Sequence, residues 1–210
     1  HPFTESPGRG DVRVTSRFRP EDPLTGLTST LHEGGHALYE LGLPEDHADL
    51  PAGQALSLGI HESQSRLWEN HVGRGLPFCH WVAPQLGQLF PQLADLSPGH
   101  LHRALTVVRP TPIRIEADEV TYNLHIILRL EIERALIGGE IETADVSAVW
   151  REKARELLGL DVPDQRRGPL QDIHWCMGAF GYFPTYTLGN LYAAMFWDAA
   201  RRDLPDLDQQ

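Results

Sequence analysis

The stretch that decides the fold of this chain is residues 31–40, which read LHEGGHALYE. His32 and His36 are four positions apart, so on an α-helix of about 3.6 residues per turn their imidazoles project from one face. Two neutral imidazoles in this arrangement can bind Zn²⁺, while Glu33 is offset from the metal and can reach a metal-bound water as a general base. The pattern predicts a zinc-dependent hydrolase built on this helix.

A chance origin of this pattern has to be weighed, because a chain with 11 histidines will contain some pairs that are four positions apart. Gly34 and Gly35 favour a functional origin. Each glycine inside a helix costs roughly 0.5–1 kcal/mol relative to alanine. A purely structural helix has no use for that cost, whereas a site that a substrate or another backbone approaches closely does.

A catalytic zinc needs a third protein ligand. The metzincin pattern requires Gly and His three and six residues after the second histidine, where this chain has Tyr39 and Gly42, so that class is excluded. The segment 58–70, LGIHESQSRLWEN, offers Glu62 and Glu69, which are seven positions apart and so on nearly the same helix face. Spacing favours Glu62 as the ligand but leaves Glu69 open, and a solvated, ion-paired face is the alternative for both.

Six short motifs occur in order along the chain. They are HPF at 1–3, DVRVT at 11–15, HEGGH at 32–36, HESQ at 61–64, IRIEAD at 113–118 and GPLQDIHW at 168–175. In content and order they resemble the carboxypeptidase Taq family of thermostable metallocarboxypeptidases, which are HExxH zinc peptidases of the gluzincin type. The resemblance implies that Glu62 is the third ligand, and that the activity is removal of single residues from peptide C-termini by a metal-bound water.

The same resemblance implies a fold and partners. It implies a mainly α, zincin-type peptidase fold, neurolysin-like, with a small β hairpin or sheet near the active site. It also implies one divalent ion per chain, Zn²⁺ or Co²⁺, a peptide substrate with a free C-terminus, and a homodimer. We expect residues 1–210 to form a single catalytic domain that resembles the C-terminal catalytic half of a longer family member, without that member's N-terminal helical region.

Recognition of a free carboxylate suits arginine, whose planar guanidinium makes two charge-assisted hydrogen bonds. Arg114 in the IRIEAD motif is the candidate for this role, which the resemblance favours. The alternative is an ion pair with the neighbouring Glu116 or Asp118.

Two residues near the last motif are candidates for a part in catalysis. Tyr182, in the FGYFP segment, could donate a hydrogen bond to the developing oxyanion, although a buried tyrosine often only packs. His174 could bind substrate or stabilise the intermediate, or it could be a structural histidine hydrogen-bonded to Asp172. The sequence leaves these alternatives open.

Composition narrows the class of protein. The formal net charge of −11, from 18 basic and 29 acidic residues, argues against a nucleic-acid or anionic-membrane partner. Cys79 and Cys176 are far apart, which is typical of a protein from a reducing cytosol rather than of a disulfide framework. No run approaches the roughly 18 apolar residues of a membrane span.

The coarse pattern is helical after a short extended start. Alternation over 11–18 predicts one strand or hairpin arm. Periodicity and Gly or Pro breaks predict helices near 29–42, 54–73, 80–94, 98–108, 115–137, 143–158 and 187–202.

Three functions therefore remain. The leading one is a cytosolic metallocarboxypeptidase with Glu33 as general base. A related metallo-oligopeptidase that cleaves internal bonds and a non-catalytic metal- or peptide-binding remnant are the alternatives.

Overall fold

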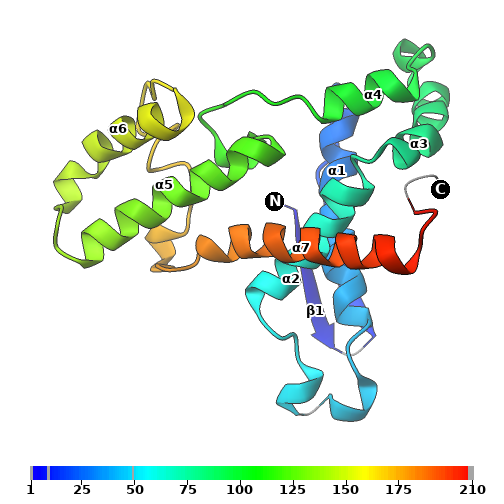
Figure 1. The fold of residues 1–210 in the computed structure, drawn as a ribbon, viewed down its shortest axis with the longest axis horizontal. Helices are drawn as coiled ribbons and strands as arrows, with labels where there is room; N and C mark the ends of the chain where they lie inside the picture. The colour runs from blue at the N-terminus through cyan, green and yellow to red at the C-terminus, as the bar shows by residue number, and fades with distance from the viewer. Residues whose placement is uncertain (1, 9, 49, 208–210) are drawn as a thin grey trace. The chain divides into compact units, whose positions relative to one another are not determined.

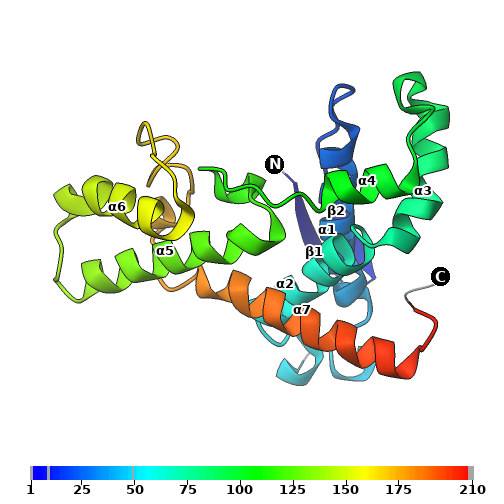
Figure 2. The same ribbon diagram turned by 45° about the horizontal axis from the view of Figure 1, so that its top comes forward.

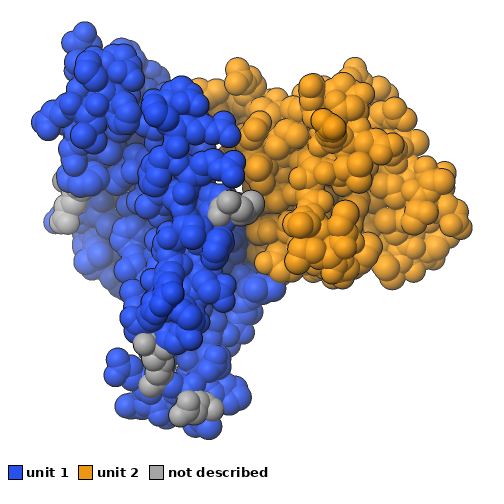
Figure 3. Space-filling view, turned by 180° about the vertical axis from the view of Figure 1, so that it is seen from behind, with its two compact units in different colours: residues 1–105, 188–210 blue, residues 106–187 orange. Residues whose placement is uncertain are grey.

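A computed structural model describes residues 2–8, 10–48 and 50–207, which form seven α-helices and one two-stranded sheet (Figure 1). The mainly α fold with a small sheet is confirmed. The chain divides into two compact units, unit 1 with residues 1–105 and 188–210, and unit 2 with residues 106–187 (Figure 3). Across the described residues, none of the helices combines the length and apolar character needed to cross a bilayer.

Unit 1 begins with an antiparallel hairpin of β1 (Phe3–Gly8) and β2 (Asp11–Thr15), which lies along α1. Gly10, in the turn, has φ of 68°, a left-handed conformation that glycine adopts without strain. The strand or hairpin arm expected over 11–18 is present but ends at Thr15, and β1, for which no bounds were expected, pairs with it. His1 of the HPF motif lies outside the described residues.

Two helices of unit 1 carry the two histidine motifs. Helix α1 (Pro23–Leu41) begins before the expected residue 29, because Asp22 caps it by accepting a hydrogen bond from Thr25 N at 3.2 Å. Pro at the first helical position suits this start. Helix α2 (Leu58–Arg66) continues as a π-helical segment (Leu67–Val72). Helices α1 and α2 pack against each other.

The remaining core of unit 1 is formed by α3 (Leu76–Leu89) and α4 (Pro98–Leu105). Its buried residues are Cys79, Val82, Ala83, Leu86 and Leu101.

Unit 2 is built on α5 (Glu119–Ile137) and α6 (Val146–Leu158), which lie side by side in both ribbon views (Figures 1 and 2). Asp118 caps α5 through the Val120 and Thr121 amides, both at 2.9 Å, so the helix starts later than the expected residue 115. The core between them is Leu128, Ile132, Trp150, Ala154, Leu158 and Val162. Helix α7 (Pro184–Asp203) starts in unit 2 and continues into unit 1.

Candidate metal centre and neighbouring clusters

Three side chains of unit 1 converge on one point. His32 and His36 of α1 and Glu62 of α2 offer ligand atoms that all lie within 4.8 Å of one another. The Nε2 atoms of the two histidines lie 3.7 and 3.5 Å from Glu62 Oε2. Two imidazole nitrogens and one carboxylate oxygen are a donor set that catalytic zinc sites use, with a further position for solvent. The structure therefore brings together the three residues proposed as ligands.

Gly35 lets the two ligand-bearing helices approach closely. A Cβ atom at this buried glycine would lie 2.7 Å from Ser65 Cα, and it would also clash with the carbonyl oxygen of Gln64. Any side chain at this position would push α2 away from α1. At Gly34, by contrast, no described atom lies within 4 Å of the site of a Cβ, so helix packing does not explain that glycine.

Glu69, the alternative ligand, lies behind His32. Its Oε2 is 2.8 Å from His32 Nδ1, and a carboxylate can only accept, so Nδ1 carries the proton and Nε2 keeps its lone pair. Burial disfavours a charged ring, but the hydrogen bond to Glu69 and the charge of Glu62 raise the pKa of His32 above its ordinary value. Glu69 thus orients a candidate ligand.

Arg66 joins the two glutamates. Its Nε donates to Glu62 Oε1 at 2.9 Å and its Nη1 donates to Glu69 Oε2 at 3.2 Å. Burial alone would raise the pKa of each carboxyl, but the Arg66 charge, with the histidine contacts, lowers both pKa values well below the ordinary range. Glu62 therefore stays ionised, as a metal ligand must, and its Oε2 is the oxygen turned toward the histidines.

His36 has a different partner from His32. Its Nδ1 lies 2.7 Å from Nδ1 of His61, and His61 Nε2 lies 2.7 Å from Glu40 Oε1. Glu40 was not among the residues predicted from the sequence. The sequence could have indicated it, because Glu40 follows His36 by four positions and so lies on the same face of α1.

Glu33, the candidate general base, is buried in α1 and is held by the hairpin. The hydroxyl of Thr4 in β1 lies 2.7 Å from Glu33 Oε2 and 2.9 Å from the Glu33 carbonyl oxygen. No bounds were predicted for β1, so this contact of Thr4 was not predicted either.

Arg114 lies in unit 2 and is buried in an ion-pair network. Its Nε and Nη2 donate to Asp172 Oδ1 at 3.1 and 2.6 Å, and its Nη1 donates to the Tyr122 hydroxyl at 2.8 Å. Arg129 binds the other oxygen of Asp172, Oδ2, through Nε at 2.7 Å. The ion-pair partner is thus Asp172 rather than the neighbouring acidic residues. A substrate carboxylate at Arg114 would have to compete with Asp172.

His174 and Tyr182 lie in an aromatic cluster of the same unit. His174 Nε2 is 3.0 Å from the Tyr186 hydroxyl rather than bonded to Asp172, and its ring centroid is 5.2 Å from that of Tyr182. Burial, followed by the charge of Arg114, lowers the pKa of His174. The Arg114 guanidinium lies 4.9 Å from the centroid of the Tyr186 ring. Tyr186, which the sequence did not single out, therefore contacts both Arg114 and His174.

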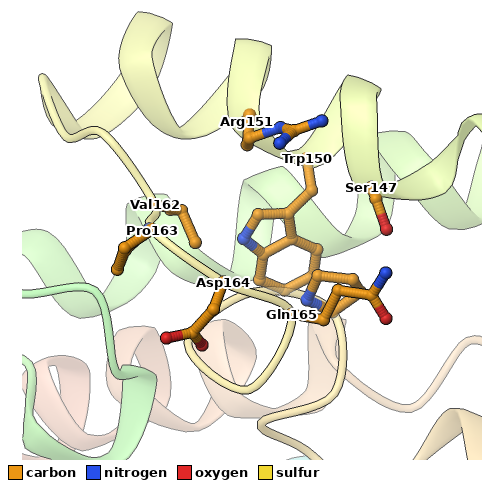
Figure 4. Close-up of a pocket in the computed structure, with 8 residues that line it drawn as sticks. Ser147, Trp150, Arg151, Val162, Pro163, Asp164 and Gln165 are labelled. Atoms are coloured by element: carbon orange, nitrogen blue, oxygen red, sulfur yellow. The ribbon is translucent and has the colours of Figure 1, made fainter.

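A separate cavity of about 350 Å³ lies in unit 2 between α6 and the loop that follows it, with Trp150 and Arg151 in its wall (Figure 4). The described residues that line it include none of the candidates from the sequence.

Comparisons with known proteins agree with one another. The family model described as carboxypeptidase Taq (M32) metallopeptidase matches residues 1–210. The chain is 52% identical over 208 residues to "Thermostable carboxypeptidase 1" of Thermus thermophilus, covering 99% of this chain and 41% of that protein. It is 43% identical over 210 residues to the protein of the same name from Pyrococcus furiosus, covering 100% and 42%. The chain thus spans about two fifths of the length of these curated relatives.

Solved structures give the same result. The M32 carboxypeptidase from Deinococcus radiodurans R1 matches with a TM-score of 0.95 and 42% identity, over 100% of this chain and 42% of that one. A Pyrococcus furiosus carboxypeptidase structure matches with a TM-score of 0.96 and 43% identity, over the same shares of the two chains.

Proposed function

Because the chain belongs to the carboxypeptidase Taq (M32) family of metallopeptidases, we propose that it supplies the metal-binding part of a carboxypeptidase that removes single residues from peptide C-termini. The observation that carries this proposal is that ligand atoms of His32 and His36 on α1 and of Glu62 on α2 converge on one point. Glu33 follows His32 directly on α1. The substrate is a peptide with a free C-terminus. We further propose that the protein acts as a homodimer in the cytosol.

The residues present fit a divalent ion. The two Nε2 atoms are free to bind it because each Nδ1 has its own partner, and Glu62 is ionised with Oε2 turned toward the histidines. Zn²⁺ and Co²⁺ both accept this donor set. When bound, the ion would act as a Lewis acid that polarises the scissile carbonyl and makes water a better nucleophile.

Glu33 acts as the general base in this proposal. Its carboxylate accepts the proton of the attacking water and later delivers that proton to the leaving amine. The Thr4 hydroxyl donates to Oε2 of this carboxylate, which helps to orient the base toward the proton that it accepts.

In this proposal, residues of unit 2 bind the substrate and stabilise the oxyanion. Arg114 receives the terminal carboxylate by exchanging part of its pairing with Asp172. Tyr182 donates a hydrogen bond to the oxyanion, and His174 binds substrate or stabilises the intermediate. These roles are supported by the contacts that Arg114, His174 and Tyr182 each make with Tyr186 in unit 2.

The experiment follows a short peptide by mass spectrometry. We expect sequential loss of C-terminal residues that a chelator stops and added Zn²⁺ or Co²⁺ restores. Glu33→Gln should abolish trimming while Zn²⁺ still binds, and Glu152→Gln, on the exposed face of α6, should leave it unchanged.

The alternatives give different results in the same assay. A C-terminally amidated peptide should resist a carboxypeptidase, whereas cleavage of internal bonds in that peptide would identify an oligopeptidase. Stoichiometric Zn²⁺ binding without any trimming would indicate a metal-binding remnant, and would overturn the proposed activity for this chain.

A further inference from the structure

We propose that His61 and Glu40 are positioning residues for His36, and that together they fix which nitrogen of the His36 ring is free to bind metal. This inference rests on the proposed role of His36 as a ligand. It assigns a function to the row of hydrogen bonds that runs from His36 on α1 to His61 on α2 and back to Glu40 on α1.

The geometry allows one arrangement of protons when both rings are neutral. Nδ1 of His36 and Nδ1 of His61 are 2.7 Å apart, so one of them must donate and the other must accept. Glu40 Oε1, 2.7 Å from His61 Nε2, belongs to a carboxylate that can only accept, so His61 carries its proton on Nε2. His61 Nδ1 is then the acceptor, and His36 carries its proton on Nδ1.

The consequence falls on Nε2 of His36. That atom keeps its lone pair and faces Glu62, with 3.5 Å between Nε2 and Oε2. Without the Glu40 carboxylate, His61 could adopt the opposite tautomer and donate to His36, which would put the His36 proton on Nε2. The carboxylate therefore selects the ring form that can bind metal, although it touches no ligand directly.

Neighbouring groups hold the hydrogen-bonded His61 and Glu40 side chains in place. The Tyr39 ring packs edge-on against His61, with 5.0 Å between centroids, and its hydroxyl accepts a hydrogen bond from Leu56 N at 3.1 Å. The side chains of His61 and Glu40 are only 22% and 21% exposed. Water therefore competes weakly for these hydrogen bonds.

The two histidine ligands are supported in unequal ways. His32 binds the Glu69 carboxylate directly, whereas His36 reaches a carboxylate only through a second imidazole. Outer partners of metal-bound histidines typically change metal affinity by 10- to 100-fold when they are removed. We expect His61 to have an effect of that size.

The test measures Zn²⁺ affinity of the 210-residue chain by competition with a chromophoric chelator. His61→Phe keeps a ring but removes both nitrogens, and should raise the Zn²⁺ dissociation constant about 10- to 100-fold. Glu40→Gln removes the charge and should give a smaller rise in the same direction. His61→Gln can accept and donate at once and should restore part of the affinity. His80→Phe, on the exposed part of α3, is the matched control and should bind like the wild type.

A second readout reports the tautomers themselves. Long-range ¹H–¹⁵N spectra of the Zn²⁺-loaded wild type should show the ring proton of His36 on Nδ1 and that of His61 on Nε2, and circular dichroism should show unchanged helix content in the metal-free variants. A His61 proton on Nδ1, or unchanged Zn²⁺ affinity in both His61→Phe and Glu40→Gln, would overturn this inference alone. A wild type that binds no Zn²⁺ would overturn the metal site itself.

Discussion

Gly189 of α7 lies directly against the side chain of Glu62 on α2. A Cβ atom at Gly189 would lie 2.6 Å from Glu62 Cγ and 2.8 Å from Glu62 Cβ, whereas real Cβ contacts essentially never fall under 3.0 Å. The missing side chain at position 189 therefore makes room for the stem of a candidate metal ligand. Nothing in the local sequence of α7 indicates this role, because the contact spans 127 positions (189 − 62).

Gly189→Ala should weaken metal binding and also lower the stability of the metal-free chain. The added methyl group meets the stem of Glu62, so either that side chain or one of the two helices must shift. We expect a higher Zn²⁺ dissociation constant and a lower metal-free melting temperature than in the wild type. Gly99→Ala is the control, since its Cβ would meet only the end of Arg103 at 3.7 Å. Equal affinity in the two variants would show that α7 adapts to the methyl group.

The two glycines of the HEGGH motif should respond to alanine in opposite directions. Gly35→Ala forces α2 away from α1 and should lower the free energy of unfolding by about 1–3 kcal/mol, as overpacked cores do. Gly34→Ala enters open space and should raise it by up to about 1 kcal/mol through helix propensity. Urea denaturation of the metal-free proteins measures both. If both variants lost a similar free energy of unfolding, the assignment of a packing role to Gly35 but not to Gly34 would be wrong.

His125 should make the protein less stable in acid. It is buried in α5, donates from Nε2 to the Thr111 carbonyl at 3.0 Å, and is 1% exposed. Burial, followed by the charge of Arg129, lowers the pKa of His125 to about 4. The unfolded chain, with a pKa near 6.5, therefore takes up this proton before the folded chain does. Stability should fall between about pH 6.5 and 4, by on the order of 3 kcal/mol from this group.

The variant His125→Gln isolates that contribution. Glutamine can still donate to Thr111 but does not titrate, so the free energy of unfolding should decline less steeply with falling pH than in the wild type. His80→Gln, at an exposed position, should follow the wild-type curve. If the curves of His125→Gln and the wild type run parallel from pH 7 to 4, the prediction fails.

Asp172→Asn should destabilise unit 2 strongly. The carboxylate binds two buried guanidinium groups, those of Arg114 and Arg129, and removing its charge leaves both without compensation. Loss of one partner from a buried ion pair typically costs about 3–5 kcal/mol. Asp161→Asn breaks an exposed pair with Arg155 and should have no measurable effect. Thermal unfolding compares the two, and equal melting temperatures would contradict the prediction.

Apolar periodicity and Gly or Pro breaks predicted all seven helices, but most of the helices begin at other residues than expected. Starts were wrong where a cap decides them, as at Asp22 for α1 and Asp118 for α5. A small hairpin was expected, but the bounds of β1 were not, because residues 1–28 are rich in Pro and Gly and it is the pairing with β2 that makes the segment extended.

The site was predictable to the extent that it is local. His32 and His36 share a helix, so their spacing placed them on one face, and family resemblance added Glu62. The partners that complete the geometry lie far away in sequence. Asp172 meets Arg114 across 58 positions, and Glu69 reaches His32 from a π-helical segment that no periodicity predicted.

Both ligand-bearing helices belong to unit 1, and this affects how bound metal would change thermal unfolding. An ion bound by α1 and α2 would cross-link segments of one compact unit, and it would directly stabilise only the segments whose native form binds it. The α5–α6 pair keeps its own apolar core and gains nothing directly from that cross-link. We therefore expect saturation with metal to raise the unfolding temperature of unit 1 more than that of unit 2, which calorimetry can measure.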